Sequence, residues 1–318
     1  MYLPTFNDIL RARETIAPYL RPTPLYNYQG LSDEVGAEVW VKHENHQPIR
    51  AFKVRGGVNF MANLDHDTKV RGVITASTGN HGQSVAYAAR LFNVRAIIAM
   101  PNGANPDKAQ AIRSMGAEIQ FVGQDFDDSR EHVEGVAKRE GMHYLSSGDE
   151  PLLIAGVGTY ALEILEDLPG ADVIIVPVGG GSGAAGACLA AKKLNQRVRV
   201  IGVQSEAAPS AYLSWKNRRR VEAKMETFAE GLATRSTFEI PQAIMRRDLD
   251  DFILVSEAEL KSAILLAIEQ THNLVEASGA AALAAAYKLR DQLHGKRVVV
   301  VMSGGNITLA QLRELLAE

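Results

Sequence analysis

Short runs of β-branched apolar residues alternate along this chain with longer amphipathic segments. Most of these runs are apolar at consecutive positions rather than at every second residue, which is typical of strands buried on both faces of a parallel sheet. Strands of this kind need helices on both faces of the sheet, so the sequence predicts an α/β fold with parallel-rich sheets. The runs are GVITA (72–76), RAIIAM (95–100), EIQFVG (118–123), DVIIVPV (172–178), RVRVIGV (197–203) and RVVVVM (297–302).

One part of the chain, 68–148, contains three complete strand–helix units of its own. We therefore expect two domains: a large one formed by 1–67 and 149–318, and a small one, 68–148, inserted into it. A cleft would lie between them. Ligands of α/β proteins bind outside the carboxyl ends of the strands, so the residues that follow each apolar run are the first candidates for a site.

Composition narrows the classes of function. The formal net charge is −3 and the pI is near 6.3, which gives no long-range field for nucleic acid or a membrane surface. No apolar run reaches the roughly 20 residues that cross a bilayer. The single cysteine, Cys188, excludes an intrachain disulfide and is typical of a reducing compartment. We expect a soluble cytoplasmic protein that acts on a small molecule.

Two segments in the first half of the chain carry chemistry. Lys53 stands between Phe52 and Val54, and apolar neighbours disfavour its ammonium form, which makes the amine a usable nucleophile or base. The segment STGNHG (77–82) follows GVITA, and its hydroxyl, amide and backbone N–H groups at a helix start suit a carboxylate or a phosphate. Considered singly, Lys53 is equally a surface lysine, and His81 is more simply a histidine of the first helical turn.

Two further segments lie in the second half. In GGGSG (179–183) the lack of side chains lets backbone N–H groups close around a phosphate. The same segment, extended to Gly186 and followed about 20 residues later by Glu206, also matches the dinucleotide-binding fingerprint, so an NAD-linked oxidoreductase is an alternative. Ser303 opens the segment SGGN (303–306) after RVVVVM, and a hydroxyl there can contact the edge of a flat ring.

Together these four segments resemble the fold-type II pyridoxal-5′-phosphate (PLP) enzymes, in the branch of serine/threonine dehydratases and serine racemases. The resemblance runs in the family's order from Thr23-Pro24-Leu25 through Lys53 to Ser303, and so covers nearly the whole chain. It implies a two-domain fold like that of the tryptophan synthase β chain, with PLP as cofactor. A dehydrogenase would need neither the lysine after Phe52 nor the SGGN strand end, which places the oxidoreductase third among the alternatives.

The resemblance implies a role for each segment. Lys53 would carry the Schiff base and then act as the base at the substrate α-carbon, with Thr78 as the second candidate catalytic residue. Phe52 would flank the ring, Asn80 would donate a hydrogen bond to the ring oxygen, and Ser303 would face the pyridine nitrogen. The phosphate would be held by Gly179, Gly180, Gly181, Ser182 and Gly183. The substrate would be bound by Ser77, Thr78, Asn80 and His81 at its carboxylate, and by Arg130 toward its distal end.

The chain departs from the family pattern at two places. Arg50-Ala51 stands where relatives often have Gly-Ser before Phe-Lys, which places a bulky cation near the expected cleft. Many relatives bind a divalent cation through a glutamate and an acidic side chain six residues on. Here Glu206 matches the first ligand but Tyr212 replaces the second, and a hard cation needs several oxygen ligands, so we expect no metal.

The activity implied is that of a dehydratase (ammonia-lyase), which removes the β-hydroxyl of a serine- or threonine-like amino acid to give a 2-keto acid and ammonia. A neutral Ser303 at the ring nitrogen would favour elimination over transamination. The nearest alternative is an amino-acid racemase on the same scaffold, with Thr78 as its second acid–base group. A non-catalytic ligand-binding relative is a fourth possibility. By the same resemblance we expect a homodimer.

Overall fold

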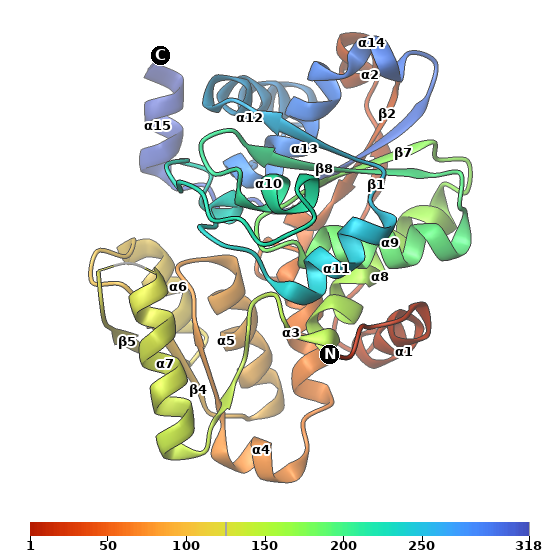
Figure 1. Ribbon diagram of the computed structural model, residues 1–318. Helices are drawn as coiled ribbons and strands as arrows, with labels where there is room; N and C mark the ends of the chain where they lie inside the picture. Colours follow the sequence, from red (N-terminus) through yellow and green to blue (C-terminus); the bar gives the residue numbers. More distant parts are fainter. Residues whose placement is uncertain (125, 318) are drawn as a thin grey trace.

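The computed structural model describes residues 1–124 and 126–317, which form two parallel-rich sheets covered by helices (Figure 1). The predicted fold class is therefore confirmed. The larger sheet has the strand order β1-β2-β10-β7-β8-β9, in which only the β1–β2 pair is antiparallel. Its strands are β1 (Leu25–Asn27), β2 (Glu38–His43), β7 (Val173–Pro177), β8 (Arg199–Ser205), β9 (Asp251–Val255) and β10 (Arg297–Met302).

Both faces of the larger sheet are buried, as its continuous apolar strands require. In β10, Val298 and Val300 pack into one apolar cluster while Val299 and Val301 pack into the other. One face is covered by α1 (Phe6–Ile16), α8 (Pro151–Asp167), α9 (Ser182–Leu194) and α11 (Glu239–Asp248). The other is covered by α2 (Gln29–Val35), α12 (Glu257–Thr271) and α13 (Ala277–Lys288).

The smaller sheet is parallel throughout and has the order β5-β4-β3-β6. Its strands are β3 (Val73–Ala76), β4 (Ala96–Met100), β5 (Glu118–Phe121) and β6 (His143–Tyr144). One face packs on α3 (Lys53–Ala62), α5 (Asn80–Phe92) and α6 (Pro106–Ser114), and the other on α7 (Phe126–Glu140). The smaller sheet therefore lies within 73–144, while the predicted domain boundaries at 68 and 148 stay a prediction.

Short elements connect these layers. The connecting elements are the 3-10 turns η1 (Glu44–His46) and η2 (Glu230–Leu232), with α4 (His66–Arg71), α10 (Ser210–Lys216), α14 (Arg290–Leu293) and α15 (Leu309–Ala317).

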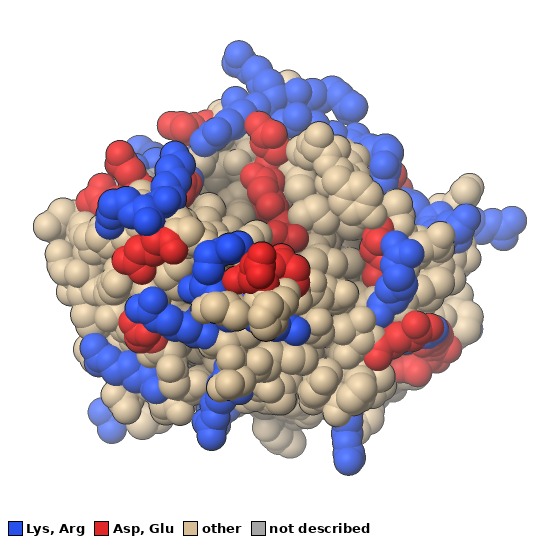
Figure 2. All heavy atoms as spheres, turned by 90° about the horizontal axis from the view of Figure 1, so that it is seen from below, with Lys and Arg blue, Asp and Glu red and all other residues tan. Residues whose placement is uncertain are grey.

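None of the helices in the part of the chain that the structure describes is long and apolar enough to cross a membrane. On the face drawn in Figure 2, basic and acidic side chains are interspersed.

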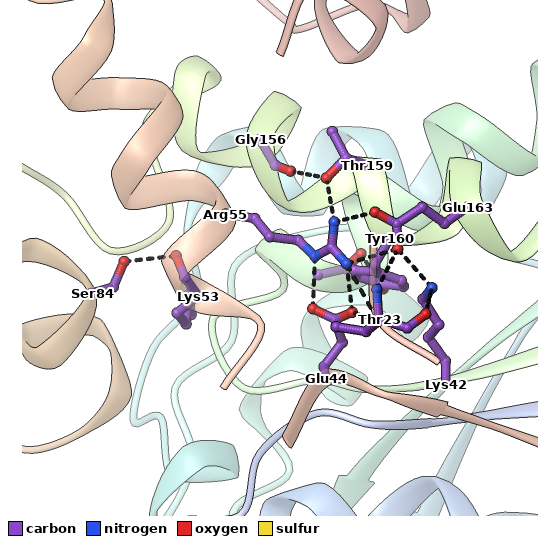
Figure 3. A network of polar contacts seen from close by, with 11 residues as sticks. Thr23, Lys42, Glu44, Lys53, Arg55, Ser84, Gly156, Thr159, Tyr160 and Glu163 are labelled. Atoms are coloured by element: carbon purple, nitrogen blue, oxygen red, sulfur yellow. Dashed lines mark hydrogen bonds and ion pairs between the residues drawn. The ribbon is translucent and has the colours of Figure 1, made fainter. Parts of the chain in front are cut away.

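A buried ion network fixes helix α3 between the two sheets (Figure 3). Arg55 is fully buried and donates to both carboxylate oxygens of Glu44, at 2.7 and 2.8 Å, and to both of Glu163, at 2.6 and 2.8 Å. Lys42 donates to Glu163 at 2.6 Å and to the carbonyl of Thr23 at 2.7 Å. The Thr23 hydroxyl donates to Glu44 at 2.6 Å, which gives the early Thr-Pro-Leu turn its structural function.

Charge in this network is balanced, with two cations facing two carboxylates. Burial disfavours the guanidinium of Arg55, but Glu44 and Glu163 outweigh that effect and hold its pKa above the ordinary value. Burial likewise opposes ionisation of Glu163, yet Arg55 and Lys42 hold its pKa below the ordinary value. Burial alone would favour the neutral form of Glu163, so its negative charge depends on Arg55 and Lys42 being in place.

Replacing Arg55 by Ala leaves Glu44 and Glu163 buried without their shared cation. We expect the free energy of unfolding to fall by about 3–5 kcal/mol, the usual cost of breaking a buried ion pair on one side. Urea denaturation followed by circular dichroism measures the change. Arg13→Ala is the matched control, because the Arg13–Glu166 pair is about half exposed and should contribute no more than about 1 kcal/mol. Equal midpoints for the two variants would contradict the assignment.

Candidate active site

A cavity of about 770 Å³ lies where the ends of β3, β7 and β10 face one another. Its volume is within the range of pockets that hold a cofactor or a drug-sized molecule. Every residue that the sequence analysis selected for a site lines this cavity, although the segments are far apart in the chain. These residues are Phe52, Lys53, Ser77, Thr78, Asn80, His81, Arg130, Gly179, Gly180, Gly181, Ser182, Gly183 and Ser303. Their individual roles stay predictions.

Lys53 begins helix α3 and reaches into the cavity wall. Its Nζ donates to Ser182 Oγ at 2.8 Å and to the Ser147 carbonyl at 3.1 Å, and lies 5.4 Å from the centre of the Phe52 ring. No carboxylate is among these contacts, and burial lowers the pKa of Lys53 to about 8. Roughly a tenth of the amine is then neutral at pH 7, so Lys53 can act as a nucleophile or a base.

The glycine segment forms the turn between β7 and helix α9. Gly181 has a φ of 90°, the left-handed region, and a Cβ on Gly179 would lie 2.1 Å from the Gly231 carbonyl oxygen. Side chains are therefore disfavoured at these two positions of the turn. The first N–H groups of a helix have no partner within the helix, and its dipole favours an anion there. The turn therefore has the features of an anion site beside the Lys53 amine, and its occupation by a phosphate stays a prediction.

Loop 77–80 between β3 and α5 is shaped by its own hydroxyl. Ser77 Oγ accepts hydrogen bonds from the backbone N–H groups of Gly79, at 3.2 Å, and Gly82, at 2.9 Å, and is itself buried. Ser77 can still donate its own hydrogen to a ligand. Thr78 is half-buried and lines the cavity next to it.

His81 is held in one neutral form. Thr75 Oγ1 donates its hydrogen to the Leu145 carbonyl at 2.7 Å, so toward His81 Nε2, 3.1 Å away, it accepts. The proton of His81 is therefore on Nε2, which leaves Nδ1 as an acceptor. Burial and the nearby charge of Lys53 lower the pKa of His81 to about 3. The imidazole side chain is thus poorly suited to donate to a substrate carboxylate, although the backbone N–H of His81 can.

The remaining predicted residues come from opposite sides of the cavity. Ser303 is buried at the end of β10; its Oγ donates to the Ser278 carbonyl at 3.4 Å, and its own carbonyl accepts from the Phe52 N–H at 3.0 Å. This pairing joins the SGGN turn to the lysine segment. Arg130 lies on α7, and its Nε is 3.9 Å from a carboxylate oxygen of Glu134.

The cavity lining outside the predicted set includes four polar residues with partners there, Glu276, Asn306, Lys108 and Glu230. Asn80 Nδ2 donates to Glu276 at 2.6 Å, and Asn80 Oδ1 accepts from Asn306 Nδ2 at 2.8 Å. Lys108 of α6 forms an ion pair with Glu230 of η2. Asn306 belongs to the SGGN segment, so the sequence motif could have indicated it as a site residue. The other three stand in no local motif, and only the fold brings them to the cavity.

The two departures from the family pattern lie outside this cavity lining. Arg50 is exposed and has a φ of 57°, which explains why glycine suits this position. Glu206 lies 3.4 Å from the Lys288 ammonium, which also contacts Glu259 at 3.0 Å. Among the residues that the structure describes, no cluster of three or more His, Cys, Asp or Glu side chains could hold a metal ion.

Comparison with known proteins agrees with this geometry. The family model described as "Pyridoxal-phosphate dependent enzyme" matches residues 16–304. The L-threonine ammonia-lyase of Thermotoga maritima is 37% identical over 98% of this chain and 78% of its own length. The L-threo-3-hydroxyaspartate ammonia-lyase of Saccharomyces cerevisiae is 34% identical over 100% and 98%. The structure of maize serine racemase superposes with a TM-score of 0.94 at 30% identity, covering 99% of this chain and 98% of that one.

We predict that removal of divalent cations with EDTA leaves activity and melting temperature unchanged. Tyr212 supplies no carboxylate, and Glu206 already lies beside the Lys288 ammonium. A cation that binds only the folded state would raise the melting temperature by mass action, which differential scanning fluorimetry with magnesium or calcium detects. A clear rise for the wild-type protein would refute the prediction. In the matched variant Lys288→Ala, which frees both carboxylates, any such rise would show that the lysine excludes the cation.

Proposed function

The chain belongs to the pyridoxal-phosphate dependent enzymes, and we propose that it is an ammonia-lyase that releases a 2-keto acid and ammonia from a β-hydroxy amino acid. The observation that carries the proposal is the meeting of the Lys53 amine and the glycine turn 179–183 in one cavity. Relatives named as ammonia-lyases match nearly the whole chain, which supports the same class of reaction here. The NAD-linked alternative is excluded by the family.

The cavity fits the cofactor on three counts. The glycines of turn 179–183 line the cavity and let the backbone N–H groups at the start of α9 face it, Lys53 offers an amine with a lowered pKa, and Phe52 presents a ring held edge-to-face against Tyr160 at 6.2 Å. Lys53 would hold PLP covalently and the glycine turn would hold its phosphate. Ser303 would face the ring nitrogen and Asn80 the ring oxygen.

When bound, PLP withdraws electrons from the substrate and stabilises negative charge at the α-carbon. The protein's own residues do the rest. Lys53, once free as an amine, takes the α-proton, and its lowered pKa keeps enough of it neutral at physiological pH to do so. Ser303 offers a neutral hydroxyl rather than a carboxylate at the ring nitrogen.

The substrate is an amino acid, and loop 77–81 is the candidate site for its carboxylate. Backbone N–H groups at the start of α5, together with the hydroxyls of Ser77 and Thr78, provide the donors that a carboxylate needs. Arg130 lines the cavity from helix α7, which covers the smaller sheet, and would face the distal end of the substrate. The names of the relatives include threonine and 3-hydroxyaspartate, so both neutral and acidic β-hydroxy amino acids are candidates.

Two wider features belong to the same proposal. We propose that two copies of the chain form a homodimer, because the resemblance to fold-type II PLP enzymes implies one. The single cysteine, Cys188, is buried in α9, and burial raises its pKa, so it is protected from oxidation. We propose a cytoplasmic setting because a chain with one cysteine forms no intrachain disulfide.

A panel of β-hydroxy amino acids tests the activity directly. We expect keto-acid release, measured with a dinitrophenylhydrazine or a coupled dehydrogenase assay, from at least one of L-serine, L-threonine and L-threo-3-hydroxyaspartate. A yellow protein with a Schiff-base absorption band that releases no keto acid from any of them would leave the family intact and refute the ammonia-lyase assignment.

Lys53→Ala should abolish turnover while the fold survives. Loss of the base alone should lower kcat by at least about a hundredfold, and loss of the covalent bond removes the near-visible absorption band. Circular dichroism checks the fold, and Lys224→Ala, a change at an exposed lysine, is the matched control. Activity close to wild type in Lys53→Ala would refute the mechanism.

Elimination should exceed racemisation. A racemase needs an acid–base group on each face of the cofactor, and Thr78 is the candidate opposite Lys53. Its methyl group makes the side chain stiff at χ1, and a misplacement of about 1 Å can cost on the order of a hundredfold. The measurement compares keto acid with the opposite enantiomer formed from L- and D-serine. Equal rates would favour the racemase, the activity in the name of the similar maize structure. Higher racemisation in Thr78→Ser, with elimination retained in Thr78→Ala, would support the stiffness argument.

A further inference from the structure

Glu276 is a carboxyl group in the cavity wall that the mechanism above does not use. It immediately precedes helix α13 and is half-buried, with its remaining surface on the cavity lining. Its Oε1 accepts hydrogen bonds from Asn80 Nδ2 at 2.6 Å and from Ser278 Oγ at 2.8 Å. A Cβ on Gly304 would lie 2.4 Å from Oε1 and 3.2 Å from Asn80 Nδ2, so backbone encloses this pair closely.

The amide of Asn80 is fixed at both ends, by Asn306, which follows strand β10, and by Glu276, which precedes helix α13. Its Oδ1 accepts from Asn306 Nδ2 at 2.8 Å, and that amide also donates to the Ile49 carbonyl at 2.9 Å. Its Nδ2 donates one hydrogen to Glu276. An amide nitrogen carries two hydrogens, so the second remains available to an acceptor in the cavity.

Positioning of this kind does not depend on the ionisation of Glu276. Burial raises the pKa of Glu276, and the nearby charge of Lys108 opposes that rise. Oε1 can accept both of its hydrogen bonds whether or not Oε2 carries a proton. A glutamine oxygen could accept the same two bonds, whereas alanine leaves the Asn80 amide free to rotate at that end.

We propose that Glu276 is a positioning residue, which holds the Asn80 amide so that its second N–H is presented to the ring oxygen of the cofactor. The proposal rests on the cofactor role given to Asn80 under the proposed function. Because Asn80 begins α5 beside the smaller sheet and Glu276 precedes a helix of the larger one, the same bond also ties the two halves of the cavity together.

A double-mutant cycle on cofactor binding tests the proposal. The dissociation constant of PLP for the apoenzyme is measured by absorbance and fluorescence titration for wild type, Glu276→Ala, Asn80→Ala and the double variant. Glu276→Ala should weaken binding about tenfold and shift the absorption maximum of the bound cofactor. If Glu276 acts through Asn80, adding Glu276→Ala to Asn80→Ala should weaken binding less than about twofold further. An undiminished tenfold loss in the double variant would overturn the proposal.

Rescue by Glu276→Gln provides the second readout. This variant should bind PLP within about threefold of wild type and keep the wild-type absorption maximum, because it keeps an acceptor for Asn80 and Ser278. A glutamine variant as impaired as the alanine variant would also overturn the proposal. The melting temperature of each apoenzyme identifies variants that fail to fold, and Glu259→Gln, at a partly exposed glutamate that does not line the cavity, is the matched control. All readouts concern the cofactor, so they stand even if no ammonia-lyase activity is found.

Discussion

The guanidinium of Arg55, shared between Glu44 and Glu163, is the interaction on which the site depends. Arg55 lies two residues beyond Lys53 on the first turn of α3, and residues two apart on a helix project in nearly opposite directions. Because the ion network holds the Arg55 side chain in place, it also fixes the direction in which the Lys53 side chain projects from α3. The geometry of four charge-assisted hydrogen bonds to two carboxylates allows α3 little freedom to rotate or slide.

Burial sets the charges inside the cavity in a consistent way. It lowers the pKa of Lys53 to about 8 and that of His81 to about 3, and it raises the pKa of Glu276. All three groups move toward their neutral forms, as expected where water is excluded and no opposite charge is in direct contact. The network around Arg55 is also buried but its charges are paired, and there Arg55 and Glu163 stay ionised. On helix α3, an amine with a lowered pKa (Lys53) and a permanently charged guanidinium (Arg55) are thus only two residues apart.

The sequence was informative where function depends on local pattern. Lys53, loop 77–81, turn 179–183 and Ser303 each adjoin an apolar strand or open a helix, and such positions meet at one edge of a parallel sheet. Glu276 and Glu230 carry no such signal, because each is a lone glutamate whose partner is 196 or 122 residues away in the chain. Arg55 stood beside the predicted lysine, yet Glu163 lies 108 residues further on. The neutral form of His81 depends on Thr75 and Leu145, which only the fold brings together.

Strand β10 lies between β2 and β7 in the middle of the larger sheet, although it is the last strand along the chain. During synthesis, β2 and β7 leave the ribosome well before β10, so each exposes an unpaired edge until residue 302 has emerged. Strands β3 to β6 can already pair once residue 144 is free, since they need nothing from beyond it. The nascent chain therefore carries a finished small sheet beside an open large one, the state in which exposed edges invite aggregation. Ser303 follows directly after β10, so the cofactor pocket is among the last parts to be assembled.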